Sequence, residues 1–172
     1  MGIIERLNKF LSWLAKEQPE VVPQHTAEKA YQMLEHDEGV RYKLYKDQNG
    51  HWSVGVGRNV DAKGFSEQDI FVMLEEDVRE AWNSAIKILG KEFFLSLSQT
   101  RQLAILNMVF QLGEKGFSDF HQTIRAIKEG RWEDAAAHGA DSLWAFQVPA
   151  RAKRVLLMLA KDVVPEEYNI TV

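Results

Sequence analysis

The sequence predicts an α+β fold with a small lobe built on a β-hairpin, a long connecting helix and a lobe made only of helices. Two short runs of alternating aromatic and polar residues flank an Asn-Gly pair at residues 49–50, which is a strong hairpin signal. A long amphipathic helical pattern follows from residue 66, and further helical patterns fill the rest of the chain. Strands segregated from helices in this way are typical of α+β folds, and a cleft between the two lobes is the expected ligand site.

The composition favours one globular unit. The 172 residues are 45% hydrophobic, which is sufficient for a core. With 21 basic and 25 acidic side chains the formal net charge is -4, so we expect no nucleic-acid partner. Cysteine is absent, which excludes disulfides and thiolate chemistry, and the five histidines form no known metal-binding motif. We therefore expect neither a metal nor another cofactor.

The first 25 residues are expected to form a separate N-terminal helix and linker, followed by a main domain over residues 26–172. Apolar residues recur at helical spacing over residues 3–15, and prolines follow at positions 19 and 23. We favour docking of this helix on the domain or on a partner chain over contact with a membrane surface. Charged residues interrupt the apolar centre that a signal peptide needs, so we expect no classical export.

An acidic cluster ends the next predicted helix, which runs from a Thr26 N-cap to Glu38 and is closed by Gly39. The carbonyl end of a helix is negative, and Glu35 and Asp37 add like charge. Both effects should raise the pKa of Glu38 above its ordinary value of about 4.3. The alternative is that these side chains are a solvated acidic surface with no chemical role.

The hairpin spans residues 42–56, and its register decides which side chains converge. An ideal two-residue turn would pair Asp47 with Trp52 and Lys46 with Ser53, which would point Asp47 and Ser53 to opposite faces. The two side chains can converge only if Asp47 leaves the strand and joins a wider loop. We expect that it does.

The remaining helices are predicted from capping and termination signals. Ser66 and Asp69 match a capping box at the start of a long helix that ends before Gly90. Nearly uniform apolar character from Leu103 to Phe110 predicts a buried helix over residues 98–113. Shorter helices are expected over residues 120–129, over 132–138 with closure by Gly139, over 142–146, and over 149–161 with Pro149 at the first position.

Glu38, Asp47 and Ser53 are the candidate chemical groups, spaced nine and six residues apart. Two carboxylates in different environments are the minimum equipment for acid–base cleavage of a glycosidic bond. A serine hydrolase is disfavoured because Ser53 lies in no Gly-x-Ser-x-Gly turn, and Ser53 is better placed to hold a water than to attack. The carboxylate pair remains by elimination.

Several separated motifs, in the same order, make the sequence resemble the phage lysozymes of the T-even type over roughly residues 27–157. The shared segments are Asp37-Glu38-Gly39-Val40-Arg41, Leu44-Tyr45-Lys46-Asp47, Asn49-Gly50, Gly55-Val56-Gly57-Arg58, the run from Ile105 to Glu114, Arg131-Trp132 and the run from Trp144 to Val155. The resemblance implies a lysozyme-like α+β fold and a muramidase that cleaves the β-1,4 bond between N-acetylmuramic acid and N-acetylglucosamine.

The resemblance also implies a role for each matching residue. Glu38 matches the general acid, Asp47 the second carboxylate, and Ser53 the hydroxyl residue, commonly threonine, that helps to position water. The second carboxylate of the family lies in a loop beside the strand pair, which is the reason to expect Asp47 outside the ladder. The family inverts the anomeric centre, which requires the two carboxyl groups to stand about 6.5–9.5 Å apart.

Further positions match the substrate cleft and its supports. Asn59, Phe110, Thr123 and His138 match substrate-binding positions, although Asn59 and His138 differ in type from the residues of the best-known relative. Arg151 matches an arginine that pairs with the catalytic acid. Arg58 stands where that relative has a histidine paired with an aspartate, here Asp77, so we expect a salt bridge in its place.

Two other functions remain open beside an active lysozyme. One is a catalytically silent peptidoglycan-binding relative, suggested by Ser53 and the changed cleft residues. The other is a lytic transglycosylase, which would need one acid and no essential Asp47. For the active enzyme we expect a monomer that binds peptidoglycan glycan strands, resides in the host bacterial cytoplasm and reaches the periplasmic wall when it is released at lysis.

Overall fold

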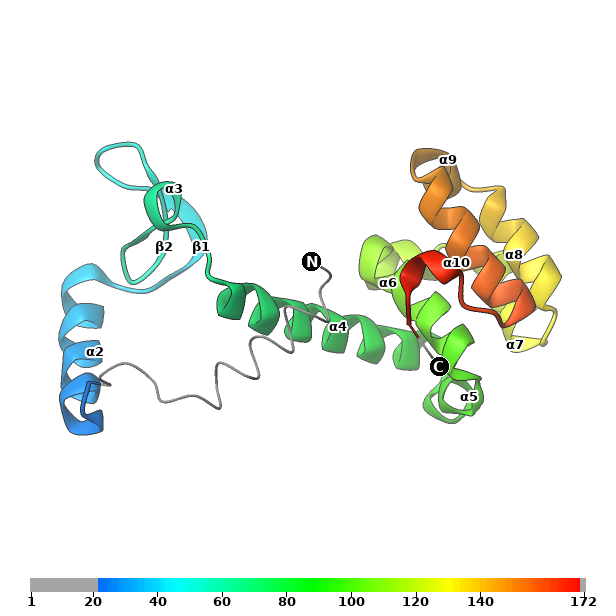
Figure 1. Ribbon diagram of the computed structural model, residues 1–172, viewed down its shortest axis with the longest axis horizontal. Helices are drawn as coiled ribbons and strands as arrows, with labels where there is room; N and C mark the ends of the chain where they lie inside the picture. The colour runs from blue at the N-terminus through cyan, green and yellow to red at the C-terminus, as the bar shows by residue number, and fades with distance from the viewer. Residues whose placement is uncertain (1–21, 171–172) are drawn as a thin grey trace. The chain divides into compact units, whose positions relative to one another are not determined.

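The computed structural model describes residues 22–170, and these form an α+β fold as predicted (Figure 1). The helix expected over residues 3–15 lies outside the described residues. The chain divides into two compact units, one up to Met73 and one from Leu74 onward, and each is described by itself. None of the helices within residues 22–170 is long and apolar enough to cross a membrane.

From residue 22 onward, the first unit contains a helix, a small sheet, a short second helix and the start of the long helix α4 (Glu67–Leu89) (Figure 1). Its elements are α2 (Gln24–Glu38), β1 (Arg41–Lys46), β2 (Trp52–Gly55), β3 (Arg58–Asn59) and α3 (Val60–Lys63). The three strands are antiparallel in the order β1-β2-β3, so β2 is central. The hairpin prediction is confirmed, whereas β3 and α3 were too short to give a periodic signal.

Helix α2 begins two residues before the predicted N-cap. Pro23 occupies the N-cap position, and its carbonyl accepts the N–H groups of Thr26 and Ala27 at 2.8 and 2.9 Å. Proline provides no side-chain cap, but its fixed φ is compatible with the start of a helix. The predicted end is confirmed, because the N–H of Gly39 closes the helix on the carbonyl of Glu35 at 2.9 Å with a φ of 71°.

Helix α4 (Glu67–Leu89) is the predicted long helix, and its start is the predicted capping box. The Ser66 N–H donates to Asp69 Oδ2 at 2.8 Å, while the Asp69 N–H donates to Ser66 Oγ at 3.1 Å. These reciprocal bonds satisfy two donors at the helix start that would otherwise lack partners.

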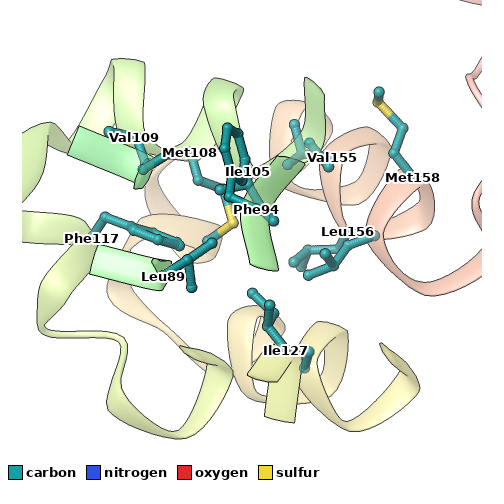
Figure 2. Close-up of a cluster of buried hydrophobic side chains, with 14 of the residues drawn as sticks. Leu89, Phe94, Ile105, Met108, Val109, Phe117, Ile127, Val155, Leu156 and Met158 are labelled. Atoms are coloured by element: carbon teal, nitrogen blue, oxygen red, sulfur yellow. The ribbon is translucent and has the colours of Figure 1, made fainter. Parts of the chain in front are cut away.

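The second unit is helical and holds the main hydrophobic core. It contains the C-terminal part of α4 and then α5 (Lys91–Ser96), α6 (Gln99–Ser118), α7 (His121–Lys128), α8 (Trp132–Ala140), α9 (Leu143–Gln147), α10 (Pro149–Lys161) and the 3-10 turn η1 (Glu166–Tyr168). Ile105 and Met108 of α6 are fully buried among Phe94, Phe117 and Val155, as expected for its nearly uniform apolar sequence (Figure 2).

Two glycines that were expected at helix ends lie within helices. Gly113 interrupts α6 with a φ of 70°, as expected, but a further helical turn continues to Ser118. Gly139 was expected to close α8 and instead lies buried inside it. A Cβ at Gly139 would lie 2.6 Å from Cδ2 of Leu156, so glycine is needed there for the close approach of α8 and α10.

Candidate active site

The turn between β1 and β2 places Asp47 outside the strand. The Asp47 N–H donates to the His51 carbonyl at 2.9 Å, and the Gly50 N–H donates to the Asp47 carbonyl at 3.0 Å. Gly50 has a φ of 82°, so the loop is the three-residue type that ends in a positive-φ glycine. The predicted departure of Asp47 from the ladder is confirmed.

The observed register differs by one residue from the ideal two-residue hairpin. Tyr45 pairs with Ser53, and Lys46 pairs with Trp52. A one-residue shift exchanges the two faces of a strand. Asp47 follows Tyr45 by two residues. Its side chain is therefore directed to the same face of the sheet as that of Ser53, and not to the opposite face.

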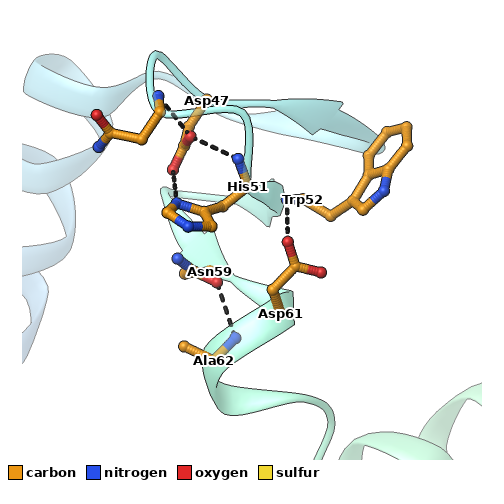
Figure 3. A network of polar contacts seen from close by, with 7 residues as sticks. Asp47, His51, Trp52, Asn59, Asp61 and Ala62 are labelled. Atoms are coloured by element: carbon orange, nitrogen blue, oxygen red, sulfur yellow. Dashed lines mark hydrogen bonds and ion pairs between the residues drawn. The ribbon is translucent and has the colours of Figure 1, made fainter.

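The carboxylate of Asp47 is held by its own turn (Figure 3). Oδ1 accepts the backbone N–H groups of Asn49 and His51, each at 2.9 Å, and Oδ2 lies 3.7 Å from Nδ1 of His51. These contacts, the His51 N–H first, hold the pKa of Asp47 below its ordinary value of 3.8. The carboxylate is therefore ionised at neutral pH.

Glu38 is the last residue of α2, and its exposed carboxyl group lies against Gly57. A Cβ at Gly57 would stand 3.3 Å from Oε2 of Glu38, and Gly57 has a φ of 71°. Gly57 belongs to the tight turn between β2 and β3. Glycine at this position thus allows both the backbone conformation and the approach of the Glu38 carboxyl group.

Ser53 lies in the central strand and is 2% exposed. It pairs with Tyr45 on one side and with Asn59 on the other. Within residues 22–170 its hydroxyl has no hydrogen-bond partner. Asp47 precedes β2. Gly57 follows β2, and the Glu38 carboxyl group lies close to the position that a Cβ on Gly57 would occupy. All three candidate residues are therefore arranged around one strand.

Strand β2 is also fixed by α3, through a residue that the sequence analysis missed (Figure 3). The Trp52 N–H donates to Oδ2 of Asp61 at 2.9 Å. Strand β3 ends at Asn59, so it offers no backbone carbonyl to the Trp52 N–H. The carboxylate of Asp61 accepts this N–H in its place. Asn59 itself accepts the Ala62 N–H on Oδ1 at 2.9 Å and so caps α3.

The sequence pattern of the phage lysozyme family matches residues 35–147, which is more than half of the chain. The chain belongs to the phage lysozyme family. This confirms the resemblance and makes the protein a glycosidase of the lysozyme type that acts on peptidoglycan.

Three relatives show the breadth of this family. The chain is 28% identical over 161 residues to "Probable T4-type lysozyme 2" of Dictyostelium discoideum, covering 78% of this chain and 95% of that protein. It is 27% identical over 168 residues to the pre-baseplate central spike protein Gp5 of Enterobacteria phage T4, covering 82% of this chain and 29% of that protein. An endolysin of Acyrthosiphon pisum secondary endosymbiont phage 1 is 23% identical over 116 residues, covering 66% of this chain and 76% of that protein.

Two residues expected to bind substrate in this lysozyme-family chain line one concavity of the second unit. Thr123 of α7 and His138 of α8 line a space of about 400 Å³, together with Asp119, Phe120, His121, Gln122, Asp141 and Ser142. Thr123 itself is only 1% exposed. Most of the lining residues carry polar side chains, which can form hydrogen bonds with sugar hydroxyl and amide groups.

Phe110 and Arg151 line a second, more apolar concavity of about 270 Å³ in the same unit. The Arg151 Nε donates to Oδ1 of Asn107 at 2.7 Å, which fixes the guanidinium. Phe110 is 41% exposed and also lines a space of about 250 Å³ with Asp77. The expected pairing of Arg151 with the catalytic acid would join the two units and stays a prediction.

Arg58 is anchored within the first unit. Its Nε donates to the Gly64 carbonyl at 3.0 Å, and its terminal nitrogen lies 3.5 Å from Oδ2 of Asp69. The expected salt bridge to Asp77 would also join the units and stays a prediction. Within residues 22–170, no three histidine, aspartate or glutamate side chains gather closely enough to hold a metal ion.

Proposed function

We propose that this protein hydrolyses the β-1,4 bond between N-acetylmuramic acid and N-acetylglucosamine with inversion of the anomeric carbon. Glu38 protonates the leaving oxygen as general acid. Asp47 accepts a proton from the attacking water as general base, and Ser53 holds that water. In an inverting glycosidase the two carboxyl groups act from opposite faces of the sugar, so they need different environments.

The observation that carries this assignment is the state of the Asp47 carboxylate. Two backbone N–H groups saturate Oδ1, and the pKa of Asp47 lies below its ordinary value, so the group is an anion throughout the neutral range. Oδ2 receives no N–H bond from the turn. Asp47 thus offers a water one ionised, accessible oxygen of fixed direction, which is what a general base provides.

Glu38 meets a different environment. Within residues 22–170 its carboxyl group accepts no hydrogen bond, and it lies close to Gly57. A carboxyl group with no such set of donors is the member of the pair better suited to carry a proton to a leaving group. The contrast between the two groups supports Glu38 as the acid and Asp47 as the base.

The second unit supplies the remaining substrate contacts in this proposal. Thr123 and His138 bind polar groups of the glycan strand, and Phe110 offers an exposed aromatic face to a sugar ring. Asn59 contributes through its amide nitrogen, because its carbonyl oxygen caps α3. The monomer resides in the host bacterial cytoplasm, reaches the periplasmic wall when it is released at lysis, and causes lysis of the cell by cleaving peptidoglycan.

The experiment that tests the proposal compares wild type with Glu38→Gln and Asp47→Asn on purified cell walls. Loss of turbidity and release of reducing N-acetylmuramic acid are both measured. The proposal requires lysis by wild type and its loss, by at least about a hundredfold, in each variant. Full activity of Asp47→Asn would favour a transglycosylase, and wall binding without lysis by wild type would identify a silent binding protein.

A further inference from the structure

The two oxygens of the Asp47 carboxylate have different neighbours (Figure 3). Oδ1 accepts two backbone N–H groups, from Asn49 and His51. Oδ2 lies 3.7 Å from the imidazole Nδ1 of His51. This distance is too long for a hydrogen bond and short enough for an ion pair when the ring is charged. The oxygen left for water therefore stands beside a group whose charge changes with pH.

The backbone keeps the imidazole next to the carboxylate. The His51 N–H donates to Oδ1 of Asp47, and the His51 carbonyl accepts the Asp47 N–H, so both residues are tied across the turn. Neither bond uses the His51 side chain. A substitution at position 51 can therefore change the group beside Oδ2 while the turn retains its hydrogen bonds.

Other charged side chains on the neighbouring elements are engaged elsewhere or lack a contact with the imidazole. Lys46 of β1 places its ammonium group 5.1 Å from the centre of the Trp52 ring. Asp61 of α3 accepts the Trp52 N–H, and Lys63, also in α3, has no ion pair within the described part of the chain. Among the described residues of the first unit, Asp47 is the one charged group that forms an ion pair with His51.

We propose that His51 is a positioning residue for Asp47, whose protonated imidazole draws Oδ2 into an ion pair and slows hydrolysis by holding that oxygen away from the attacking water. This inference rests on the proposed role of Asp47 as general base. A neutral ring leaves Oδ2 available, and a charged ring both competes with water and makes the carboxylate a weaker base. The enzyme is consequently faster when His51 is neutral.

The expected effect is moderate because the pair is partly exposed. The side chains of His51 and Asp47 are 52% and 29% exposed, so solvent weakens their attraction. We expect His51→Gln and wild type to cleave at equal rates near pH 8, and His51→Gln to be about two- to fivefold faster near pH 5. Glutamine retains a polar side chain of similar reach without a titrating ring.

The test measures cleavage rates of soluble peptidoglycan fragments from pH 5 to pH 8 for wild type, His51→Gln and Lys63→Gln. Lys63→Gln removes a positive charge from the same unit at an exposed site that has no contact with Asp47. Its rate ratio to wild type should be the same at every pH, because lysine stays charged over this range. Only for His51→Gln should the ratio of the variant's cleavage rate to the wild-type rate rise as the pH falls.

A second measurement separates this inference from the proposed function. Carbon-detected NMR follows the titration of the Asp47 carboxyl group, which should shift to higher pH in His51→Gln because the nearby positive charge is lost. If Asp47→Asn is inactive but the His51→Gln ratio is constant with pH, the positioning role is wrong and the base assignment stands. If Asp47→Asn is fully active, the proposed function itself fails.

Discussion

The carboxyl group of Glu38 lies against the backbone of Gly57, with Oε2 3.3 Å from the point that a Cβ at residue 57 would occupy. The end of helix α2 and the turn between β2 and β3 thus meet at a position where a side chain on residue 57 would crowd the Glu38 carboxyl group. Asp47 stands in the turn at the other end of β2. The strand therefore links the surroundings of the two proposed catalytic carboxyl groups, with Ser53 between them.

Gly57→Ala should impair catalysis more than it impairs folding. Its φ of 71° makes alanine unfavourable by about 1–2 kcal/mol, and the new methyl group would displace the Glu38 carboxyl group by a few tenths of an ångström. We expect a loss of activity of about tenfold, measured with urea-induced unfolding in parallel.

Gly64→Ala is the matched control for Gly57→Ala. Gly64 has a φ of 59° and nothing within 4 Å of its Cβ position. Alanine at residue 64 is therefore unfavourable only because of the backbone conformation, and not because of a contact with a neighbouring side chain. Equal losses of activity in the two variants would show that the Glu38 contact is irrelevant to catalysis.

Ser53→Ala should reduce activity at little cost to stability. Ser53 is 2% exposed, and its hydroxyl has no hydrogen-bond partner within residues 22–170, so its removal leaves no protein group unpaired. We expect the free energy of unfolding to change by less than about 1 kcal/mol and the cleavage rate to fall about tenfold or more. An unchanged rate would refute the assignment of Ser53 as the residue that holds water.

The stability of the protein should depend on pH through Asp47. Its pKa is below the ordinary value of 3.8, chiefly because of the His51 N–H, so the folded state favours the anion. Such a group contributes stability that is present above the unfolded pKa and is lost as the pH falls through the folded pKa. Between about pH 5 and pH 2, wild type should therefore lose more stability than Asp47→Asn in urea titrations. Parallel pH curves for the two proteins would contradict the ionised, hydrogen-bonded state of Asp47.

Gly139→Ala should destabilise the second unit by about 1–2 kcal/mol, because its methyl group would collide with Leu156. The same change in a Leu156→Ala background should be neutral or stabilising, since the space is then free and alanine favours a helix. A double-mutant cycle by thermal unfolding measures this coupling. Additive effects would show that α8 and α10 relax around the extra methyl group.

The helices of this protein were largely predictable because their ends carry local chemistry. The Ser66–Asp69 capping box, Gly90, Gly113 and Pro149 each satisfy or break backbone hydrogen bonds within a few residues. Gly139 was misassigned because its reason is tertiary: Leu156 lies 17 positions away in the sequence, and no local pattern reports that contact.

The candidate site was only partly visible in the residues themselves. Spacing and elimination pointed to Glu38 and Asp47, while the roles of Arg151, Thr123 and His138 came from the family resemblance. The register at Asp47 was open because a three-residue and a two-residue loop share the Asn-Gly signal. Asp61 and His51 were missed because their contacts depend on where β3 ends and on which oxygen of Asp47 remains free.

The central claim is an inverting hydrolysis that uses Glu38 as acid and Asp47 as base. The measurement that tests it most directly is proton NMR of the first product formed by wild type from a soluble peptidoglycan oligosaccharide, recorded before the anomers equilibrate. The account predicts the α-anomer of a reducing N-acetylmuramic acid, and no product from Asp47→Asn. An initial β-anomer, or a non-reducing anhydro sugar that Asp47→Asn also forms, would contradict it.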